Sequence, residues 1–217
     1  MNCGTNKTVF VRGNVLTVVR LDVTSNKKIV TDKREKMVQT YHFSRAQFEH
    51  VQSGTATWKS LQDIAYTAGN CLDCGFRGNG CYVAKFNQAR GLLGMLKSIL
   101  RAFPTWDDLP VPSADMYDDI ALQCLGRYVR FGSYGEPIML PFPLVAKMAS
   151  ASRSYTGYTH AWANPIYSAY SAYFMASTEQ ANAGSATGWR EFNVWQDVKQ
   201  ADDITCPASK EGGERSN

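Results

Sequence analysis

The sequence has no long apolar run and no apolar stretch at its beginning. No segment approaches the ~18 consecutive apolar residues that a membrane-spanning helix needs. Residues 1–7 lack the apolar core of a signal peptide. We therefore expect a cytoplasmic protein without a membrane segment. In that reducing compartment, clustered cysteines favour metal or redox roles over structural disulfides.

Several catalytic motifs are also missing. The chain has no Gly-x-Ser-x-Gly, no His-Glu-x-x-His and no paired-carboxylate motif, which leaves classical hydrolase chemistry without support. It has only 3 histidines. His42 and His50 flank a predicted surface helix, and we expect them to be incidental. There are no internal repeats and no clear linker.

The composition is that of a globular protein with a mild positive charge. The 217 residues are 44% hydrophobic and 19% charged, with a net charge of +4. This charge is compatible with nucleic acid but is not a concentrated basic patch. We expect one compact domain overall. Within it, residues 1–68 form a β-hairpin and short helices, residues 69–205 a cysteine loop and an α/β unit, and residues 206–217 a Cys-Pro segment and polar tail.

The first half of the chain predicts a hairpin followed by helices. β-Branched residues surround a Gly13-Asn14 turn within residues 9–19. The basic residues between positions 27 and 36 are expected to form a solvated connection. A short helix that carries Phe48 and Val51 on one face is expected after a Ser44 cap. Further helices are expected at 57–66, 85–101, and from a Ser113 cap to 125. In the last of these, Met116, Ile120 and Leu125 are expected to face inward and Cys124 to be an inert core thiol.

The second half alternates between strands and helices. Strands are expected at 128–132, 155–160, 173–176 and 189–194, with helical segments at 142–151, 165–170 and 178–186. This order implies a mostly parallel sheet with right-handed crossovers. The fold class predicted for the whole chain is α/β, a partial or open (β/α) barrel with mostly parallel strands. An N-terminal β-hairpin and a cysteine-rich metal loop precede the barrel.

Three thiols lie within eleven residues. Cys71, Cys74 and Cys81 follow a Cys-x2-Cys-x6-Cys spacing among glycines, a pattern typical of a zinc knuckle or an iron–sulfur site. Cys206, next to a proline in a polar segment, is the expected fourth metal ligand, and His160 is the other candidate. Three thiolates with one open iron would also fit. A reversible Cys71–Cys74 disulfide without metal is the remaining alternative.

A second group of candidates follows the strand at 128–132. In α/β folds the active residues gather beyond the carboxyl ends of parallel strands. Arg130 lies within this strand, and Ser133 and Glu136 come directly after it. Glycines at 132 and 135 bracket a tight turn whose backbone N–H groups are a candidate anion cradle, so Ser133 and Gly135 are predicted to bind a cofactor or phosphate. The turn is not a Walker loop, because no Lys-Ser/Thr follows.

A third group lies in residues 155–162. Strand alternation would place Thr156, Tyr158, His160 and Trp162 on one face. Tyr, His and Trp together are unusual for a pure core. His160 is therefore a candidate for proton transfer or metal binding, although a hydrogen-bonded core histidine would give the same pattern.

Taken together, these segments resemble a family of proteins encoded by tailed bacteriophages. The matching pieces are Cys71-x2-Cys74, Gly80-Cys81-Tyr82-Val83, residues 130–137, residues 155–162, Met175-Ala176-Ser177, residues 188–192 and Cys206-Pro207-Ala208-Ser209. They span residues 69–217 in the family's order. The chain departs from the family pattern in two ways. It has Glu136 where the family has Asp, and it ends at Asn217, whereas family members continue into a further cysteine cluster. The wider likeness is to iron–sulfur proteins with a radical-SAM-like partial barrel, although the Cys-x3-Cys-x2-Cys spacing of radical-SAM enzymes is absent.

Two functions are expected from these observations and the resemblance. The first is a phage-encoded metalloenzyme with an iron–sulfur or zinc site held by Cys71, Cys74, Cys81 and Cys206. In it, His160, Glu136, Arg130 and Tyr158 would face a nucleotide or nucleic acid. The second is a zinc-stapled protein that binds nucleic acid or a host protein without catalysis.

Overall fold

The computed structural model describes residues 6–23, 37–67, 71, 88–178 and 183–193. Within these ranges the strands are β1 (Lys7–Arg12), β2 (Val15–Val23), β3 (Met37–Ser44), β4 (Tyr128–Tyr134), β5 (Ser154–Thr156), β6 (Tyr158–Thr159), β7 (Met175–Thr178) and β8 (Glu191–Asn193). The α-helices are α1 (Arg45–Gln52), α2 (Trp58–Thr67), α4 (Gln88–Ala102), α5 (Ala114–Cys124) and α6 (Phe142–Ala151). Short 3-10 helices are η1 (Trp106–Asp108), η2 (Pro137–Met139), η3 (Ala161–Ala163), η4 (Pro165–Ala172) and η5 (Ser185–Thr187).

The described strands form two sheets. The first has five strands in the order β1-β2-β3-β4-β5, and the second has the order β6-β7-β8. β1, β2 and β3 pair antiparallel, whereas β3–β4 and β4–β5 pair in parallel. Both pairings of the second sheet are parallel. The mixed α/β class is thus confirmed, but the sheet at the N-terminal end is mixed rather than mostly parallel.

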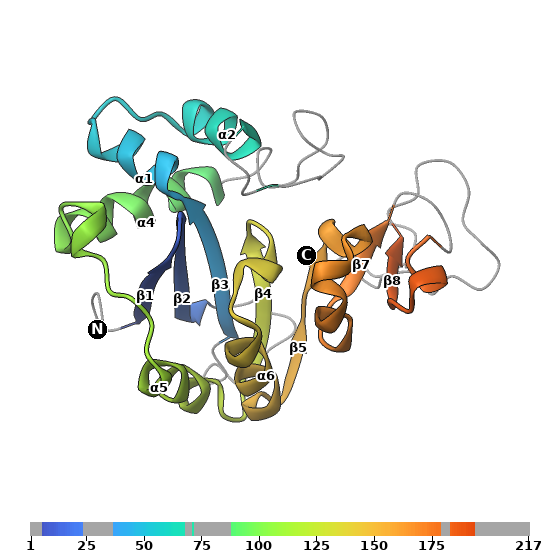
Figure 1. The fold of residues 1–217 in the computed structure, drawn as a ribbon. Coiled ribbons are helices and arrows are strands. Elements are labelled where there is room, and N and C mark those ends of the chain that lie inside the picture. The colour runs from blue at the N-terminus through green and yellow to red at the C-terminus, as the bar shows by residue number, and fades with distance from the viewer. Residues whose placement is uncertain (1–5, 24–36, 68–70, 72–87, 179–182, 194–217) are drawn as a thin grey trace, which may run out of the picture.

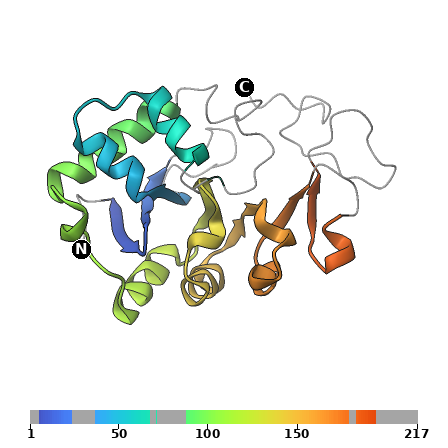
Figure 2. The ribbon, with the colours of Figure 1, turned by 45° about the horizontal axis from the view of Figure 1, so that its top comes forward.

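Helices cover both faces of the first three strands (Figure 1). One core cluster joins one face of β1–β3 to α1, α2 and α4, and it includes Val9, Phe43, Phe48 and Leu96. The other cluster, which we call the lower core, joins the opposite face to α5 and α6. In Figure 2, α5, α6 and η4 lie in a row along one side of the strands, on the side of the lower core.

One continuous segment links the two sheets. β5 pairs with β4, and β6, which starts two residues after the end of β5, pairs with β7. Between them lies Gly157, where a Cβ atom would come within 2.7 Å of Phe174 and 3.1 Å of Phe131. The single strand predicted at 155–160 is therefore two short strands that belong to different sheets. The break occurs where the backbone packs too closely on the lower core for any side chain.

Most local predictions in the first half are confirmed. The hairpin turns at Gly13, and α1 begins at a capping box in which the Ser44 and Gln47 side chains bond to each other's backbone N–H. α2, α4, α5 and α6 lie at the expected positions. Ser113 caps α5, Ile120 is buried and Met116 packs against the lower core, but Leu125 is 68% exposed, contrary to prediction.

Three predictions about the central segments are wrong. β3 was not expected at all, and it places His42 in the middle of a sheet, fully buried, rather than beside a surface helix. The strand expected at 173–176 is β7, at Met175–Thr178, so Thr178 ends a strand instead of capping a helix. Of the helix expected at 178–186, residues 183–184 form a turn and Ser185 begins the 3-10 helix η5.

Some expectations fall outside the described residues. These are the basic connection at 27–36, the beginning of the helix at 85, most of the cysteine loop and the tail at 206–217. Among the described helices, none is long and apolar enough to cross a membrane.

Candidate functional site

Glu136 is held in a tight turn at the end of β4. The turn is made by Gly132 and Gly135, whose φ angles of 66° and 74° are in the region that favours glycine. A Cβ atom on Gly135 would lie 2.8 Å from the carbonyl oxygen of His42, and one on Gly132 would lie 2.9 Å from Pro137. The turn therefore packs directly against β3. This packing leaves Glu136 only 4% exposed, although it carries a carboxylate.

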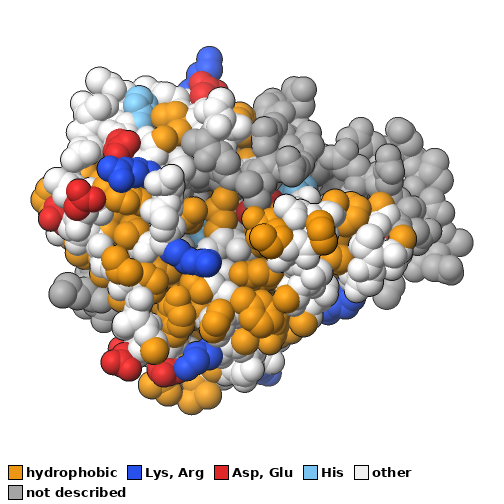
Figure 3. All heavy atoms as spheres, viewed as in Figure 1, with side chains coloured by type: hydrophobic (Ala, Val, Ile, Leu, Met, Phe, Trp, Pro, Cys, Tyr) orange, Lys and Arg blue, Asp and Glu red, His pale blue; other side chains and the backbone are white. Residues whose placement is uncertain are grey.

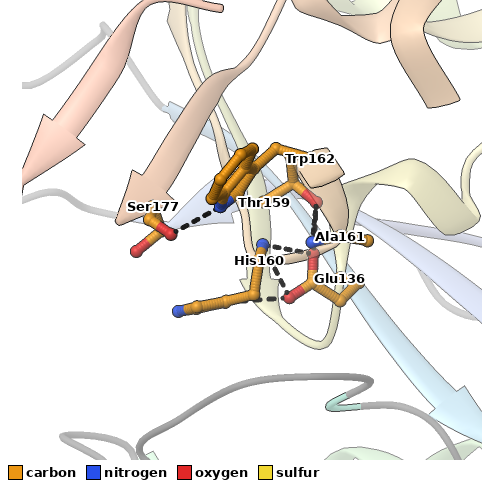
Figure 4. A network of polar contacts seen from close by, with 6 residues as sticks. All are labelled: Glu136, Thr159, His160, Ala161, Trp162 and Ser177. Carbon is orange, nitrogen blue, oxygen red and sulfur yellow. Dashed lines mark hydrogen bonds and ion pairs between the residues drawn. The ribbon is translucent and has the colours of Figure 1, made fainter. Parts of the chain in front are cut away.

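The carboxylate of Glu136 has two side-chain partners, one at the end of β6 and one directly after it (Figure 4). The Thr159 hydroxyl donates to Oε2 at 2.7 Å, and Nδ1 of His160 lies 2.9 Å from Oε1. The backbone N–H of His160 also points at the carboxylate, 3.3 Å from each oxygen. A buried carboxylate needs such partners, because its desolvation is costly without them. These contacts fix the position of both oxygens.

The contact with Glu136 determines which end of the His160 imidazole can react. An ionised carboxylate only accepts hydrogen bonds, so Nδ1 carries the proton in this pair. In the neutral ring Nε2 then has the lone pair, and Figure 4 shows the ring extending away from Glu136. The His160 side chain is 24% exposed, against 5% for Glu136. The geometry is that of an imidazole oriented by a carboxylate, which suits proton transfer or metal ligation at Nε2.

Thr159 connects the carboxylate to the following turn. Its hydroxyl donates to Glu136 and accepts the backbone N–H of Ala161 at 3.1 Å, and the side chain is fully buried. The chain then enters η3, so His160 and Trp162 leave the strand. Trp162 donates its indole N–H to the carbonyl oxygen of Ser177 at 3.1 Å, which ties η3 to β7. The predicted common face therefore includes Thr156 and Tyr158 only.

A buried polar group supports the turn from the β3 side. The ring nitrogens of His42 lie 3.2 Å from the Thr17 hydroxyl and 3.3 Å from that of Thr40. The Thr40 hydroxyl also accepts the backbone N–H of Gly132 at 2.8 Å. Burial lowers the pKa of His42 from 6.5 to about 3, so the imidazole is neutral at physiological pH. His42 is a structural element of the turn rather than an incidental surface residue.

Arg130 and Tyr158 lie on the sheet face opposite the lower core. Arg130 pairs in register with Thr156, while its neighbours Val129 and Phe131 are in the lower core. Because side chains alternate along a strand, Arg130 and Thr156 point the other way. Gly157 faces the lower core, so Tyr158 also points to this opposite face. Both Arg130 and Tyr158 are half-buried.

The two residues predicted as an anion cradle have different environments. Ser133 is 6% exposed, and its hydroxyl has no hydrogen-bond partner among the described residues. Gly135 lies against the His42 backbone, so its tight packing explains the glycine without any ligand. The turn that was predicted to bind an anion therefore also positions Glu136.

Of the four predicted metal ligands, only Cys71 is described. It is half-buried and packs against the cluster formed by β1–β3, α1, α2 and α4. Cys74, Cys81 and Cys206 lie outside the described residues. Within the described part of the chain, no three His, Cys, Asp or Glu residues are grouped so that they could hold a metal. Cys124 is fully buried in the lower core, as expected, and burial raises the pKa of its thiol to about 12.

The sequence reasoning missed Thr159 and the Thr17–His42–Thr40 group. Thr159 had a usable signal, since it directly precedes His160 and ends a short strand. The His42 group had none that is local, because Thr17 and His42 belong to different strands and meet only through the register of β2 and β3.

Comparison with known proteins adds nothing to these observations: no family model, no curated protein and no solved structure matches the chain.

Proposed function

We propose that the protein is an enzyme in which His160 transfers a proton at Nε2 and Glu136 orients the imidazole through Nδ1. The observation that carries the proposal is the 2.9 Å contact between His160 Nδ1 and a carboxylate that is almost completely buried. A positioned imidazole of this kind typically contributes a factor of about 10²–10⁴ to a rate. A purely structural histidine would not require its ring to extend from the carboxylate toward a partly exposed position.

The strand arrangement supports a site at this place. β3, β4, the β5–β6 segment, β7 and β8 follow one another in the chain, and each pairs in parallel with the next. This sequential winding favours an open (β/α) barrel, in which reactive groups gather beyond the carboxyl ends of the strands. Glu136 follows β4 and His160 follows β6, so both occupy that position.

The proposed enzyme holds a metal centre through Cys71, Cys74, Cys81 and Cys206. Thiolates are preferred ligands of zinc and of iron–sulfur clusters, so the chemistry of the donor set suits either. When bound, such a centre supplies a Lewis acid or an electron-transfer group. In this proposal the chain's own groups divide the remaining work: His160 moves the proton, Glu136 and Thr159 hold it in place, and Arg130 attracts negative charge.

A nucleotide or nucleic acid is the substrate class that we propose. The mild positive charge of the chain favours a polyanionic ligand, and Arg130 provides a cation on the same sheet face as Tyr158. The resemblance to phage-encoded proteins also favours this class and a location in the host cytoplasm.

The proposal is tested by product analysis together with metal analysis. Anaerobically purified protein is incubated with ribo- and deoxyribonucleotides and with single- and double-stranded oligonucleotides, and products are followed by mass spectrometry. We expect turnover to fall at least 100-fold in His160→Gln and Glu136→Gln. The control variants His50→Gln and Glu49→Gln, which change the same residue types on α1, should keep wild-type turnover.

The same preparation separates the two expected functions. A brown protein that contains iron and absorbs near ~400 nm identifies the cluster-bearing form of the enzyme. A colourless protein with one zinc ion that binds polynucleotide equally well in wild type, His160→Gln and Glu136→Gln, with no product formed, would contradict the enzyme and support the zinc-stapled binding protein.

A further inference from the structure

The aromatic side chains of Tyr158 and Phe192 form a pair on the sheet face opposite the lower core. Their ring centroids are 4.5 Å apart, at an interplanar angle of 47°. Both residues are half-buried. They come from β6 and β8, which are not neighbours in the sheet.

The register explains how these rings meet. Tyr158 pairs with Met175 of β7, and Phe192 pairs with Ser177, two residues further along the same strand. Met175 and Ser177 therefore share a face, whereas Ala176 between them belongs to the lower core. β6 and β8 lie on either side of β7, about 10 Å apart, so the two rings lean toward each other over β7.

A buried aromatic pair in a core has no unused surface, but this pair has no core cluster above it among the described residues. Neither Tyr158 nor Phe192 is a member of, or packs against, either cluster of buried residues. In contrast, the aromatic residues Tyr155, Tyr167 and Tyr173 all pack against the lower core. The Tyr158–Phe192 pair is thus a second aromatic group with a different environment.

The pair shares its face with a cation and lies beside the Glu136–His160 contact. Thr156 is two residues before Tyr158, and Arg130 is the register partner of Thr156. Arg130 is therefore about one strand spacing, roughly 5 Å, from Thr156 on the neighbouring strand. His160 is two residues after Tyr158. One end of this face is aromatic, the other is cationic, and the reactive imidazole adjoins it.

We propose that this face binds a single-stranded polynucleotide, with a base stacked on the Tyr158–Phe192 pair and a phosphate near Arg130. The inference rests on the proposed function and assigns the substrate's form. Stacking suits a base because its flat π-surface covers an aromatic ring whatever its sequence, and the guanidinium suits a phosphate. A sheet face of about four β-strands is wide enough for two or three bases. This width favours a polynucleotide over a single nucleotide as the ligand.

The opposite side of the molecule does not offer an equivalent surface. The large exposed hydrophobic residues are Val111, Leu122, Leu125, Phe142 and Ile166. Leu122, Phe142 and Ile166 belong to α5, α6 and η4, which contribute to the lower core. In the view of Figure 3, Lys and Arg side chains are scattered singly among hydrophobic ones. The exposed ring of Phe142 does pair with Tyr170 and Tyr173, but Tyr170 belongs to the lower core and Tyr173 packs against it, so these rings are part of the core packing.

The test is binding of a fluorescein-labelled (dT)12 strand to the full chain, measured by fluorescence anisotropy at several salt concentrations. We expect Tyr158→Leu and Phe192→Leu each to weaken binding by about 5- to 100-fold. Tyr158→Trp should bind at least as tightly as the wild type. Arg130→Gln should weaken binding and reduce the slope of log K against log salt by about one. The control Tyr167→Leu, an aromatic residue on the other side of the sheet, should bind as the wild type does, and circular dichroism checks that each variant is folded.

Each other outcome has a defined meaning. Wild-type binding that is unchanged in Tyr158→Leu and Phe192→Leu would overturn the stacking site while leaving the proposed substrate class intact. If the wild type binds AMP or TMP but not (dT)12, and Tyr158→Leu loses this nucleotide binding, the polynucleotide is not the ligand. The same two rings would then bind a free nucleotide. If the wild type binds neither, both this inference and the proposed substrate class fail.

Discussion

Nδ1 of His160 lies 2.9 Å from Oε1 of Glu136, a residue 24 positions earlier in the chain. The two groups meet because β4 and the β5–β6 segment run in parallel and both end at the same edge. Glu136 is held by the turn after β4, and His160 begins the 3-10 turn after β6. The contact therefore depends on backbone geometry at two separate places, which allows specific predictions.

Replacing Glu136 by Gln should change the tautomer of His160. The carboxylate accepts from the Thr159 hydroxyl on one oxygen and from Nδ1 on the other, whereas an amide has a single oxygen. The Nδ1–H tautomer of the neutral His160 ring is then no longer favoured over the Nε2–H tautomer. Nitrogen-15 NMR of His160 at neutral pH should show mainly the Nδ1–H tautomer in the wild type and a mixture in Glu136→Gln. The same spectrum in both proteins would contradict the assigned pairing.

Replacing Thr159 by Val should destabilise the protein by about 2–4 kcal/mol. The valine keeps the shape but removes a hydroxyl that both donates to Glu136 and accepts from the N–H of Ala161, so two buried polar groups lose a partner. Urea unfolding measures the change in the free energy of unfolding.

Two further variants serve as controls for Thr159→Val. Thr159→Ser, which keeps the hydroxyl, should lose less than half as much stability. Thr187→Val, which removes one bond to the Gly184 carbonyl at a less buried position, should cost about 1 kcal/mol. Equal losses in Thr159→Val and Thr159→Ser would mean that packing, not the hydroxyl, is important.

Much of the fold could be predicted from local signals. The Ser44 cap and the Gly13 turn are encoded by a few neighbouring residues, and the apolar stripe of α4 has a clear helical period. These elements depend on nearest neighbours and on the apolar period. The cap, the turn and the helix would therefore form in many different folds.

β3 was missed for a physical reason. From Val38 to Ser44 every residue is buried, since both faces of this central strand are covered by helices. The alternation of apolar and polar residues that marks a half-exposed strand is therefore absent. Thr40 and His42 are polar but buried, and their hydrogen bonds to Gly132 of β4 and Thr17 of β2 are not revealed by sequence patterns.

The positions of Glu136 and His160 near the ends of strands could be predicted from the sequence, but the contact between their side chains could not. Sequence placed Glu136 and His160 after two strands, and parallel winding brings such ends to one edge. Whether the side chains touch depends on the irregular register between β3 and β4 near Gly132 and on the break at Gly157. Both features arise from close packing between distant segments.

Replacing Gly135 by Ala should be far more harmful than the same change at Gly54. Both glycines have a positive φ, which costs about 1–2 kcal/mol for any other residue. A Cβ atom at Gly54 meets nothing within 4 Å, but at Gly135 it would lie 2.8 Å from the His42 carbonyl oxygen. Chemical unfolding should show a loss of about 1–2 kcal/mol for Gly54→Ala and clearly more for Gly135→Ala, together with reduced turnover in the latter. Similar losses at the two positions would disprove the close approach.

His42 should make the protein sensitive to mild acid. Its pKa falls from 6.5 to about 3 on folding because burial disfavours the charged form. Above pH ~6.5 the folded and unfolded states both hold a neutral ring, so the stability is fully present. Between pH ~6.5 and ~3 only the unfolded state binds the proton, and stability decreases by up to about 1.4 kcal/mol per pH unit from this residue.

Urea unfolding at pH 7.5, 6.5, 5.5 and 4.5 measures this dependence. In His42→Gln the loss between pH 6.5 and 4.5 should be smaller by about 2–3 kcal/mol than in the wild type. His50→Gln, which changes a half-buried histidine of α1 that bonds to Ser60 of α2, should follow the wild-type curve. Parallel curves for wild type and His42→Gln would show that His42 does not cause the acid sensitivity.

The Cys124 thiol should resist alkylation until the protein unfolds. Burial in the lower core raises its pKa to about 12, so almost none of it is thiolate at pH 8, and the thiolate is the reactive form. Iodoacetamide treatment at pH 8 followed by peptide mass spectrometry should find Cys124 unmodified in the native protein and fully modified in 8 M urea. Cys71, which is half-buried at the edge of its cluster, provides the comparison within the same sample. Rapid native labelling of Cys124 would show that the lower core opens on the time scale of the experiment, in conflict with the complete burial of this side chain at the end of α5.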